Sequence, residues 1–327
     1  AERRRGKKLR HSVTAALFAV SGLICWCGIS QVISNSVSEA FQNAFSIPPL
    51  VTTLVLTALA AVIVLRKEAT VKSLDVIVPI MAGCYFVMTL WIILTHLPQL
   101  PDVFVRIFSE ALGLRQAVGG GFGAVVMNGI KRGLFSNEAG SGSAPCAAAA
   151  AECDDPVKMG LVQALGVLID TIVICSCTGF AILLSGVLHS GAIGVNLVQA
   201  AFSANLGSFG NYFVMLMTFL FCFTTIIADV FYGEVSVRYL FKETPEKVER
   251  YVKMFKILVL LLIIVGSMMQ LDDLWDFVDF GVAFLVLFNV YALLKMKGDV
   301  VHVLKDYLEK LKEGKIPSWE AEGSQPR

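Results

Sequence analysis

Two adjacent threonines and an aspartate lie in an apolar stretch that reads FTTIIADVFYGE. Thr224 and Thr225 offer neighbouring hydroxyls, and Asp229 follows Thr225 by four residues. Residues four apart lie on one face of a helix, so this hydroxyl and carboxylate share a side. Hard cations such as sodium prefer oxygen ligands of these kinds. The stretch therefore predicts a sodium site; the alternative is that the threonines bond back to carbonyls of their own helix.

A glycine-rich stretch at 119–151, GGGFGAVVMNGIKRGLFSNEAGSGSAPCAAAAA, is a second feature that could carry chemistry. Four glycines fall within 119–123, and glycine costs about 1 kcal/mol relative to alanine inside a helix. A helix that unwinds at membrane depth survives where its freed backbone groups are buried in protein or line a wet cavity. Such helices build the midplane sites of secondary transporters. We expect the unwound backbone at 119–123, with Gly140 and Gly142 in a turn or a second break. The alternative is a glycine packing face.

A third feature is an acid within an apolar segment, Asp170 in GVLIDTIVICSCTG. An acid at such a position costs ~2.5–3.5 kcal/mol on insertion scales and is functional by default. The alternative is a structural acid bonded to hydroxyls such as Thr171 or Thr178. Asp279 is a second acid within an apolar segment, but it lies closer to the end of its segment and therefore less deep in the membrane.

Two basic residues help to place the glycine-rich stretch in depth. Lys131 and Arg132 follow the glycines by about ten residues, or ~15 Å of helix, which predicts a position at the cytoplasmic boundary. Glu138 beside them is open to interpretation as a boundary salt bridge. Gln31, in GISQVISNS, either lines the site or makes a hydrogen bond between helices.

The composition excludes an ordinary soluble domain. The 327 residues are 56% hydrophobic and 16% charged, whereas soluble domains carry about 25% charged residues. The eight cysteines include no CxxC pair, so we expect no cofactor and no metal beyond sodium. The four histidines fall near the ends of apolar segments, without the spacing of a metal site or a nucleophile–base pair. We therefore expect a membrane protein that is not an enzyme and binds no nucleic acid.

Apolar segments long enough to cross a bilayer predict an all-α polytopic protein with eight crossings. One is the broken helix, expected at about 115–135. LPDVFVRIFSEALGLRQAV reads as an interfacial helix, IGVNLVQAAFSANLG as a short helical hairpin, and 301–311 as an amphipathic helix on the membrane surface. The other seven crossings are 13–33, which continues as the more polar SNSVSEAFQNAF, then 47–65, 74–97, 157–188, 212–232, 254–269 and 274–296.

The distribution of charge predicts the orientation. Basic residues cluster in 1–12, which places this start in the cytoplasm by the positive-inside rule. Alternating crossings then put the basic loop at 238–256 inside, the uncharged segment 189–211 outside, and the acidic residues of 272–276 outside. We expect a multi-pass protein of the plasma (inner) membrane with both ends of this chain in the cytoplasm.

Three motifs, NGIKRGLFSNEAGSGSAP, GLVQALGVLIDT and FTTIIADVFYGE, closely resemble the sodium:alanine symporter family, also called alanine or glycine:cation symporters or amino acid carrier proteins. The resemblance is ordered and covers roughly residues 12–300. It implies a leucine-transporter-like fold of two five-helix inverted repeats, each beginning with a broken helix. It also implies sodium-coupled uptake of a small neutral amino acid, of the alanine or glycine type, by alternating access.

In that fold the crossings would be helices three to ten of ten, so we expect an N-terminally truncated chain. The family signature GGPGA followed by FWMW, and the other broken helix, would lie in the missing part. The resemblance divides the chain into a basic start at 1–12 and the last three helices of the first repeat at 13–97. The second repeat is 98–298, and 299–327 is a cytoplasmic amphipathic helix and tail.

The resemblance also implies site residues. Phe135, Ser136 and Asn137 match the family's helix-six motif by position, and Thr225 matches its helix-eight motif. Many members have tryptophan where this chain has Asp229, and a carboxylate there changes the size and charge of the pocket. We expect the zwitterion near 119–128 with its carboxylate on helix-end N–H groups, and sodium on Thr224 or Thr225. The expected substrate-binding residues are Gln31, Gly121, Phe122, Asn128, Phe135, Thr225 and Asp229.

Two alternatives to sodium symport remain open. A proton-coupled amino-acid permease of the same fold would use Asp170 or Asp229 as its titrating acid and would not need sodium. A non-transporting helical membrane scaffold would use its glycines for packing alone and would bind no ligand.

Overall fold

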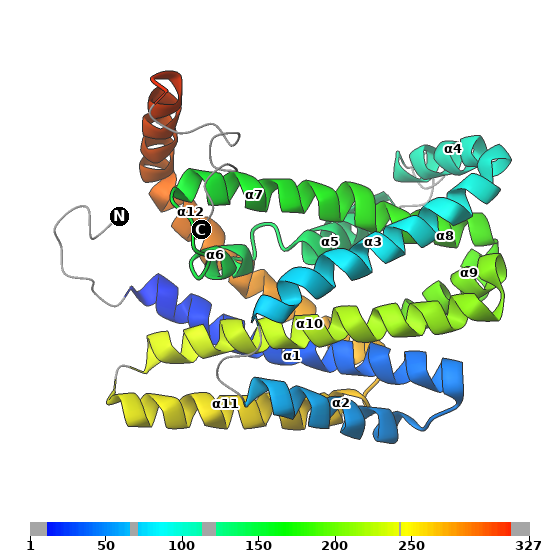
Figure 1. Ribbon diagram of the computed structural model, residues 1–327, viewed down its shortest axis with the longest axis horizontal. Coiled ribbons are helices and arrows are strands. Elements are labelled where there is room, and N and C mark those ends of the chain that lie inside the picture. Colours follow the sequence, from blue (N-terminus) through cyan, green and yellow to red (C-terminus); the bar gives the residue numbers. More distant parts are fainter. Residues whose placement is uncertain (1–11, 66–70, 113–121, 242, 315–327) are drawn as a thin grey trace, which may run out of the picture.

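The computed structural model describes residues 12–65, 71–112, 122–241 and 243–314, apart from the side chains of 71–75 and 122 (Figure 1). Over these ranges the chain forms helices and turns, with no strand. Two expected site features, Gly121 and the side chain of Phe122, lie outside the described part.

Helix α1 (Val13–Phe45) is the centre of the fold. Ser30, Ser34 and Ser38 are spaced by four residues, so they share one face, and all three are buried. The Ser34 hydroxyl donates to the Ile263 carbonyl at 2.6 Å, and the Ser38 and Thr53 hydroxyls share a hydrogen bond of 2.9 Å. Small polar side chains of this kind let membrane helices approach closely and bond to one another. These bonds give partners to the buried serines in the second half of α1. Helix α1 continues through this more polar half without a break.

Helix α10 (Ser208–Leu240) runs antiparallel to α1 (Figure 1). Two ring contacts show the antiparallel register: Phe45 at the end of α1 meets Tyr212 near the start of α10 at 5.3 Å, and Trp26 near the middle of α1 meets Tyr232 at 5.5 Å. Helices α2 (Pro49–Val64) and α11 (Pro245–Gly266) pack on the same two helices through one apolar cluster. Asn35 donates to the carbonyls of Gly266 at 3.3 Å and Met269 at 2.9 Å. Asn35 thereby supplies a donor to carbonyls at the end of α11 and just beyond it, where a helix runs out of its own N–H partners.

A second apolar cluster joins α10 to α3 (Val71–Thr95), α8 (Cys175–Ser185) and α9 (Gly194–Leu206). The Tyr85 ring lies 5.6 Å from Phe202 and 6.5 Å from Phe213, and its hydroxyl shares a 2.8 Å hydrogen bond with Thr178. Helix α7 (Pro156–Leu168) runs into α8 through a π-helical turn at Ile169–Ile174, and α4 (Leu100–Ala111) packs against α8. The expected crossing at 157–188 is therefore one rod with a widened middle turn.

Helix α12 (Leu271–Lys312) covers the remaining side of α1. A Cβ on Gly281 would lie 3.1 Å from Cys25, and one on Gly28 would lie 2.8 Å from Phe277. These glycines allow the two helices to touch. Helix α12 continues through 301–311, so these residues are helical as expected, in one piece with the preceding crossing. Their position on the membrane surface stays a prediction. Figure 1 shows this end extending beyond the other helices.

The expectation of a helical hairpin in 193–207 is wrong. Helix α9 is a single helix that ends at Leu206, and Gly207 turns the chain directly into α10. Among the described residues, five helices are long and apolar enough to cross a membrane: α1, α3 from Val76, α7 with α8, α10 and α12. Helix α2 has 16 residues, or about 24 Å of helix. The remaining expected crossings, and the two inverted repeats, stay predictions.

Candidate functional site

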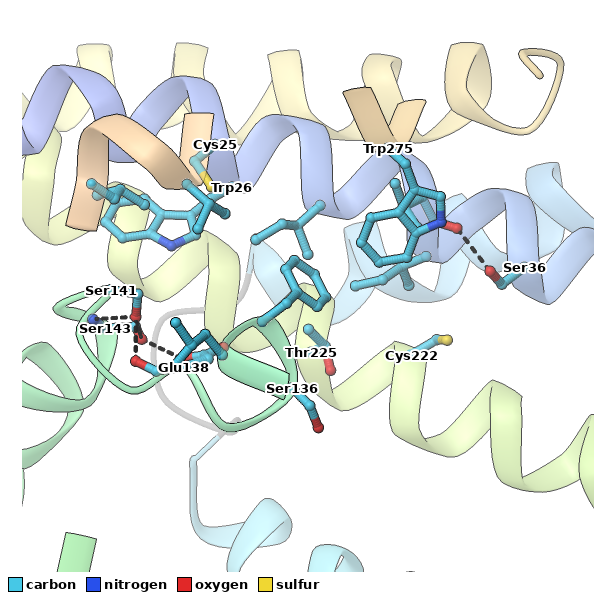
Figure 2. A pocket seen from close by; sticks show the side chains of 17 residues that line it. Cys25, Trp26, Ser36, Ser136, Glu138, Ser141, Ser143, Cys222, Thr225 and Trp275 are labelled. Carbon is cyan, nitrogen blue, oxygen red and sulfur yellow. Dashed lines mark hydrogen bonds between the residues drawn. The ribbon is translucent and has the colours of Figure 1, made fainter. Parts of the chain in front are cut away.

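A cavity of about 310 Å³ lies near the midpoints of the two central helices α1 and α10. Figure 2 shows side chains converging on it from α1, α10 and α12, and from α5 (Phe122–Asn137) with the segment that follows. Most of the walls are apolar, with a few polar groups, which is typical of small-molecule sites. The lining residues are Cys25, Trp26, Ile29, Val32, Ile33, Ser36, Leu134, Phe135, Ser136, Glu138, Ser141, Ser143, Cys222, Thr225, Trp275, Val282 and Leu285.

A helix break forms one wall of this cavity. The chain from Phe122 to Asn137 is an uninterrupted helix, and the irregular backbone comes after it, at 138–142. Glu138, Gly140 and Gly142 have φ of 54°, 89° and 93°. A positive φ cannot continue a right-handed helix, so the chain stops there and resumes as α6 (Ser143–Ala148). A break is therefore present at the second glycine group. Gly119, Gly120 and Gly121 of the first group, where the unwound backbone was expected, lie outside the described residues. Gly123, from the first group, lies inside α5.

The broken segment is held by its own polar groups. The Asn137 side chain accepts from the Ala139 N–H at 2.9 Å, and the Ser141 hydroxyl donates to the Glu138 carbonyl at 2.8 Å. The Glu138 carboxylate accepts from the Ser143 hydroxyl. Asn289 of α12 donates to the Gly140 carbonyl at 2.9 Å. Backbone groups freed by the break thus find partners in the protein, as they must in a membrane.

The two adjacent threonines have different positions relative to the cavity. Both hydroxyls donate to the Phe221 carbonyl, Thr224 at 2.8 Å and Thr225 at 2.9 Å. This is the back-bonding that the sequence left open. Thr225 also lines the cavity, whereas Thr224 is not among the lining residues. A donating hydroxyl keeps oxygen lone pairs, so Thr225 remains able to bind a cation.

Asp229 lies behind the cavity wall rather than in it. Its side chain is 3% exposed and accepts a long hydrogen bond of 3.5 Å from Ser30 of α1. It is also close enough to Glu138 for the two carboxyl groups to interact electrostatically. A buried carboxyl is costly unless it is paired or neutral. The carboxyl groups of Asp229 and Glu138 thus place acidic character beside the cavity.

The other expected site residues are spread more widely. Phe135 lines the cavity, and its ring meets Trp275 at 4.9 Å. Gln31 is 8% exposed, donates to the Cys27 carbonyl at 3.3 Å and packs against Gly266 of α11. Asn128 is exposed on α5, ten residues before the break begins at Glu138. The structure therefore brings Phe135 and Thr225 to one cavity, but not Gln31 or Asn128.

Asp170 joins the end of α5 to the π-helical turn. It accepts a hydrogen bond of 2.8 Å from the Ser136 hydroxyl, and Asn137 donates to the Thr171 hydroxyl at 2.9 Å. The acid thus bonds to a hydroxyl, but to one on another helix and not to Thr171 or Thr178. Single π-turns often mark functional segments, and this one fixes the two residues that precede the break.

Lys131 and Arg132 pair with Asp279, not with Glu138. Arg132 makes two bonds to the Asp279 carboxylate, at 3.2 and 3.1 Å, and Lys131 lies 3.4 Å from it. The salt bridge proposed with Glu138 is therefore wrong. Asp279 belongs to the first quarter of α12, near its junction with α11. The charge pattern predicts that this end is external, so that prediction and the cytoplasmic-boundary position predicted for the two basic residues cannot both hold.

Several lining residues have no clear signal in the sequence. Figure 2 shows Trp26 and Trp275 at opposite ends of the cavity, and Glu138 with Ser141 and Ser143 beside Trp26. The left-handed glycines Gly140 and Gly142 could have indicated the break, because SNEAGSGS combines glycine with cap-forming residues. The tryptophans give no such signal, because their place depends on how the helices pack. Among the described residues, no group of three or more His, Cys, Asp or Glu is placed to hold a metal ion.

Known proteins similar to this chain form a consistent group. The model of the sodium:alanine symporter family matches residues 5–321. The probable sodium/glutamine symporter GlnT of Bacillus subtilis (strain 168) is 38% identical over 315 residues, which is 95% of this chain and 65% of GlnT. The amino-acid carrier protein AlsT of the same organism is 35% identical over 313 residues, 94% of this chain and 65% of AlsT. The sodium/proton-dependent alanine carrier protein of Bacillus sp. (strain PS3) is 33% identical over 332 residues, covering 97% and 73%.

The extent of these matches bears on two expectations. The chain spans slightly less than two thirds of the length of GlnT and of AlsT. The family match begins at residue 5 and lends no support to the expectation that two helices are missing. Because the match covers nearly the whole chain, and the relatives share a third or more of its residues, the chain belongs to the sodium:alanine symporter family.

Proposed function

We propose that this chain is part of a carrier that moves a small neutral amino acid, of the alanine or glycine type, together with sodium by alternating access. Relatives of the chain are named as a sodium/glutamine symporter, an amino-acid carrier and a sodium/proton-dependent alanine carrier. Such a carrier performs no covalent chemistry. Each solute needs only to bind more tightly to one state of the protein than to the other.

The observation that carries the proposal is the cavity at the helix break. It lies halfway along α1 and α10, and its volume of about 310 Å³ is at the lower end of ligand sites. Broken helices beside such cavities are where secondary transporters bind their solutes. A packing face made of glycines would need no cavity, so this feature favours a binding site over the scaffold alternative.

The cavity offers complementary groups to a zwitterion. The Glu138 carboxylate is positioned to receive an ammonium group, and Phe135, Trp26 and Ile29 give an apolar wall for a small side chain. Thr225 supplies a hydroxyl oxygen for sodium across from the break. In the natural protein the site would also include further sodium ligands and groups that bind the carboxylate of the amino acid. In this proposal Thr224 contributes less than Thr225, because it is not among the lining residues.

Proton coupling is the second candidate, and Asp229 is the observation that favours it. This acid is buried beside the cavity with a hydroxyl as its partner, and one relative is named for dependence on sodium or protons. A proton on Asp229 would remove the cost of a buried charge. The neutral isostere Asp229→Asn distinguishes the two ions, because it removes the titrating group and leaves Thr225 in place.

Uptake into sealed vesicles tests both candidates. The natural protein that contains this chain is reconstituted, and uptake of labelled alanine, glycine and glutamine is measured under an inward sodium gradient or an inward proton gradient. We expect concentrative uptake of alanine or glycine with sodium alone, and retention of sodium-driven uptake in Asp229→Asn. Uptake that follows the proton gradient and disappears in Asp229→Asn would establish the second candidate instead. No concentrative uptake under either gradient would contradict both.

A further inference from the structure

Trp275 forms a wall shared by two cavities. On one side it lines the central cavity, where Figure 2 shows it at the end away from Trp26. On the other side it lines a surface depression of about 430 Å³, together with Arg132, Asp272, Asp276 and the start of α9. We call this depression the vestibule. Trp275 is the residue that the two linings share, so it lies where a solute passing directly from the vestibule to the central cavity would meet it.

Two neighbouring side chains hold the Trp275 ring in place. The Arg132 guanidinium lies 4.2 Å from the ring centroid, a cation–π contact. The same guanidinium bonds twice to Asp279, one turn further along α12. Phe135 meets the ring edge-to-face at 4.9 Å from the cavity side. The ring is therefore fixed between α5 and its own helix.

These contacts are of a kind that can break and form again. The Arg132 side chain is 45% exposed and Asp279 is 19% exposed, and ion pairs at exposed sites stabilise a protein weakly. The other side-chain bonds of α5, from Ser136 to Asp170 and from Asn137 to Thr171, join it to the π-helical turn and not to α12. The basic residues are on α5, which leads into the break, and the acid is on α12. Separation of this pair would therefore free the ring and move the wall that carries the break.

We propose that Trp275, held by Arg132 and Asp279, is a gate between the vestibule and the central cavity. The inference rests on the proposed function, because it assumes that solutes reach the central cavity. The gate is closed in the described conformation. It opens when the Arg132–Asp279 pair separates, and the charge pattern places it on the external side of the membrane.

Chemical labelling of a cavity cysteine tests the gate without any substrate. Cys222 lines the central cavity, so a protein that keeps Cys222 and has alanine at its other seven cysteine positions reports entry into that cavity. A membrane-impermeant thiol reagent is added to sealed vesicles from the Trp275 side, and then from the other side in a separate experiment. We expect Trp275→Ala and Arg132→Ala to raise the labelling rate about tenfold from the Trp275 side, because each removes a contact made only in the closed state. From the opposite side the rate should not rise.

Arg238→Ala is the matched control. Arg238 also pairs with carboxylates, with Glu234 at 2.7 Å and with Glu249 at 2.8 Å. It lies near the C-terminal end of α10 and is not among the residues that line the cavity or the vestibule. It should leave labelling from the Trp275 side unchanged. If the alanine variants do not fold, Arg132→Lys replaces them, because lysine keeps the charge and loses the two-pronged bond and the stacking. It should raise the rate less than alanine would.

Three results would overturn the gate. The first is an unchanged labelling rate of Cys222 in the Arg132 and Trp275 variants. The second is a rise in that rate that is equal from both sides of the membrane, which indicates general loosening. The third is a rise in Arg238→Ala as large as the rise in the gate variants. Because the readout needs no amino acid or sodium, a failed gate leaves the proposed transport activity standing. A protein that transports nothing could still show the gate.

Discussion

At the scale of single residues, position relative to the cavity separates groups that look equivalent in the sequence. Thr224 and Thr225 are adjacent and bond to the same carbonyl, yet Thr225 alone is among the lining residues. Glu138 is a cavity acid, although its neighbours Lys131 and Arg132 suggested a salt bridge. Two predictions follow from these placements.

Replacement of Thr225 should weaken sodium binding more than replacement of Thr224. We expect Thr225→Ala to raise the sodium concentration for half-maximal uptake about tenfold, the effect of losing one hydrogen-bond-strength ligand of ~1–1.5 kcal/mol. Thr225→Ser keeps the oxygen and should behave nearly as the parent. Uptake as a function of sodium concentration measures all three. A larger effect in Thr224→Ala than in Thr225→Ala would contradict the assignment.

Removal of the Glu138 charge should weaken binding of the amino acid. Glu138→Gln keeps the size of the side chain and can still accept from Ser143, but it loses the attraction for an ammonium group. We expect KM for the amino acid to rise about tenfold or more, since hydrogen bonds to charged groups contribute ~1.5–3 kcal/mol. The control is Glu249→Gln, whose carboxylate pairs with Arg238 at 2.8 Å and is 41% exposed. Equal KM values in the two variants would rule out the role of Glu138.

At the scale of elements, the break after α5 depends on two left-handed glycines in different surroundings. A Cβ on Gly142 would lie 2.6 Å from the Phe18 ring and 3.0 Å from Asn289, whereas a Cβ on Gly140 would meet nothing within 4 Å. Both positions require a positive φ. Gly142 therefore serves both the backbone and the packing of the segment against α1 and α12.

Alanine at the two glycines should separate these effects. Gly140→Ala should lower the free energy of unfolding by about 1–2 kcal/mol, the cost of a left-handed non-glycine residue. Gly142→Ala should lower it by about 1–3 kcal/mol more, because the added methyl overpacks the contact with Phe18. Unfolding in detergent, followed by denaturant titration, measures the difference. Equal losses of unfolding free energy in the two variants would show that the Phe18 side chain moves aside at little cost.

The contact between α11 and α1 gives a second prediction at this scale. A Cβ on Gly266 would lie 2.5 Å from the Gln31 Cα, which is backbone and cannot move aside as a side chain can. We expect Gly266→Ala to destabilise the protein by about 1–3 kcal/mol. Gly166→Ala, in open space near the C-terminal end of α7, should stabilise the helix by ~0.5–1 kcal/mol. The same titration checks both, and a neutral Gly266→Ala would show that α11 is loosely packed.

At the scale of the whole molecule, one helix organises the bundle. Helix α1 contacts α2, α10, α11 and α12, and the cavity opens at its midpoint. Movement of α5 away from α12, as proposed for the gate, would change access to the cavity while α1, α10 and α12 stay packed together. This arrangement suits alternating access, in which one group of helices moves against another around a fixed site.

The orientation of the bundle is a prediction at this scale. The basic start at 1–12 and the basic residues around 238–256 predict cytoplasmic positions, and the acidic start of α12 predicts an external one. Cysteines introduced at Ser12 and at Asp272 of a cysteine-free protein should react with an impermeant reagent from opposite sides of intact cells. We expect labelling at 272 in intact cells and at 12 after the membrane is opened. The reverse pattern would invert the gate as well.

The sequence by itself determined the membrane class, the approximate ends of the five helices that are long and apolar enough to cross a membrane, and the family. Each of these depends on local composition: long apolar runs, loop charges and contiguous motifs such as FTTIIADVFYGE. The sequence also identified Phe135 and Thr225, which line the same cavity, because each belongs to a motif that resembles the family. Only the tertiary structure showed that the chain breaks at Gly140 and Gly142 beside the cavity. It decided that Lys131 and Arg132 meet Asp279, and that Trp26 and Trp275 close the two ends of the cavity. These outcomes depend on how helices far apart in sequence pack against one another, and packing distances are not encoded in the spacing of residues along the chain.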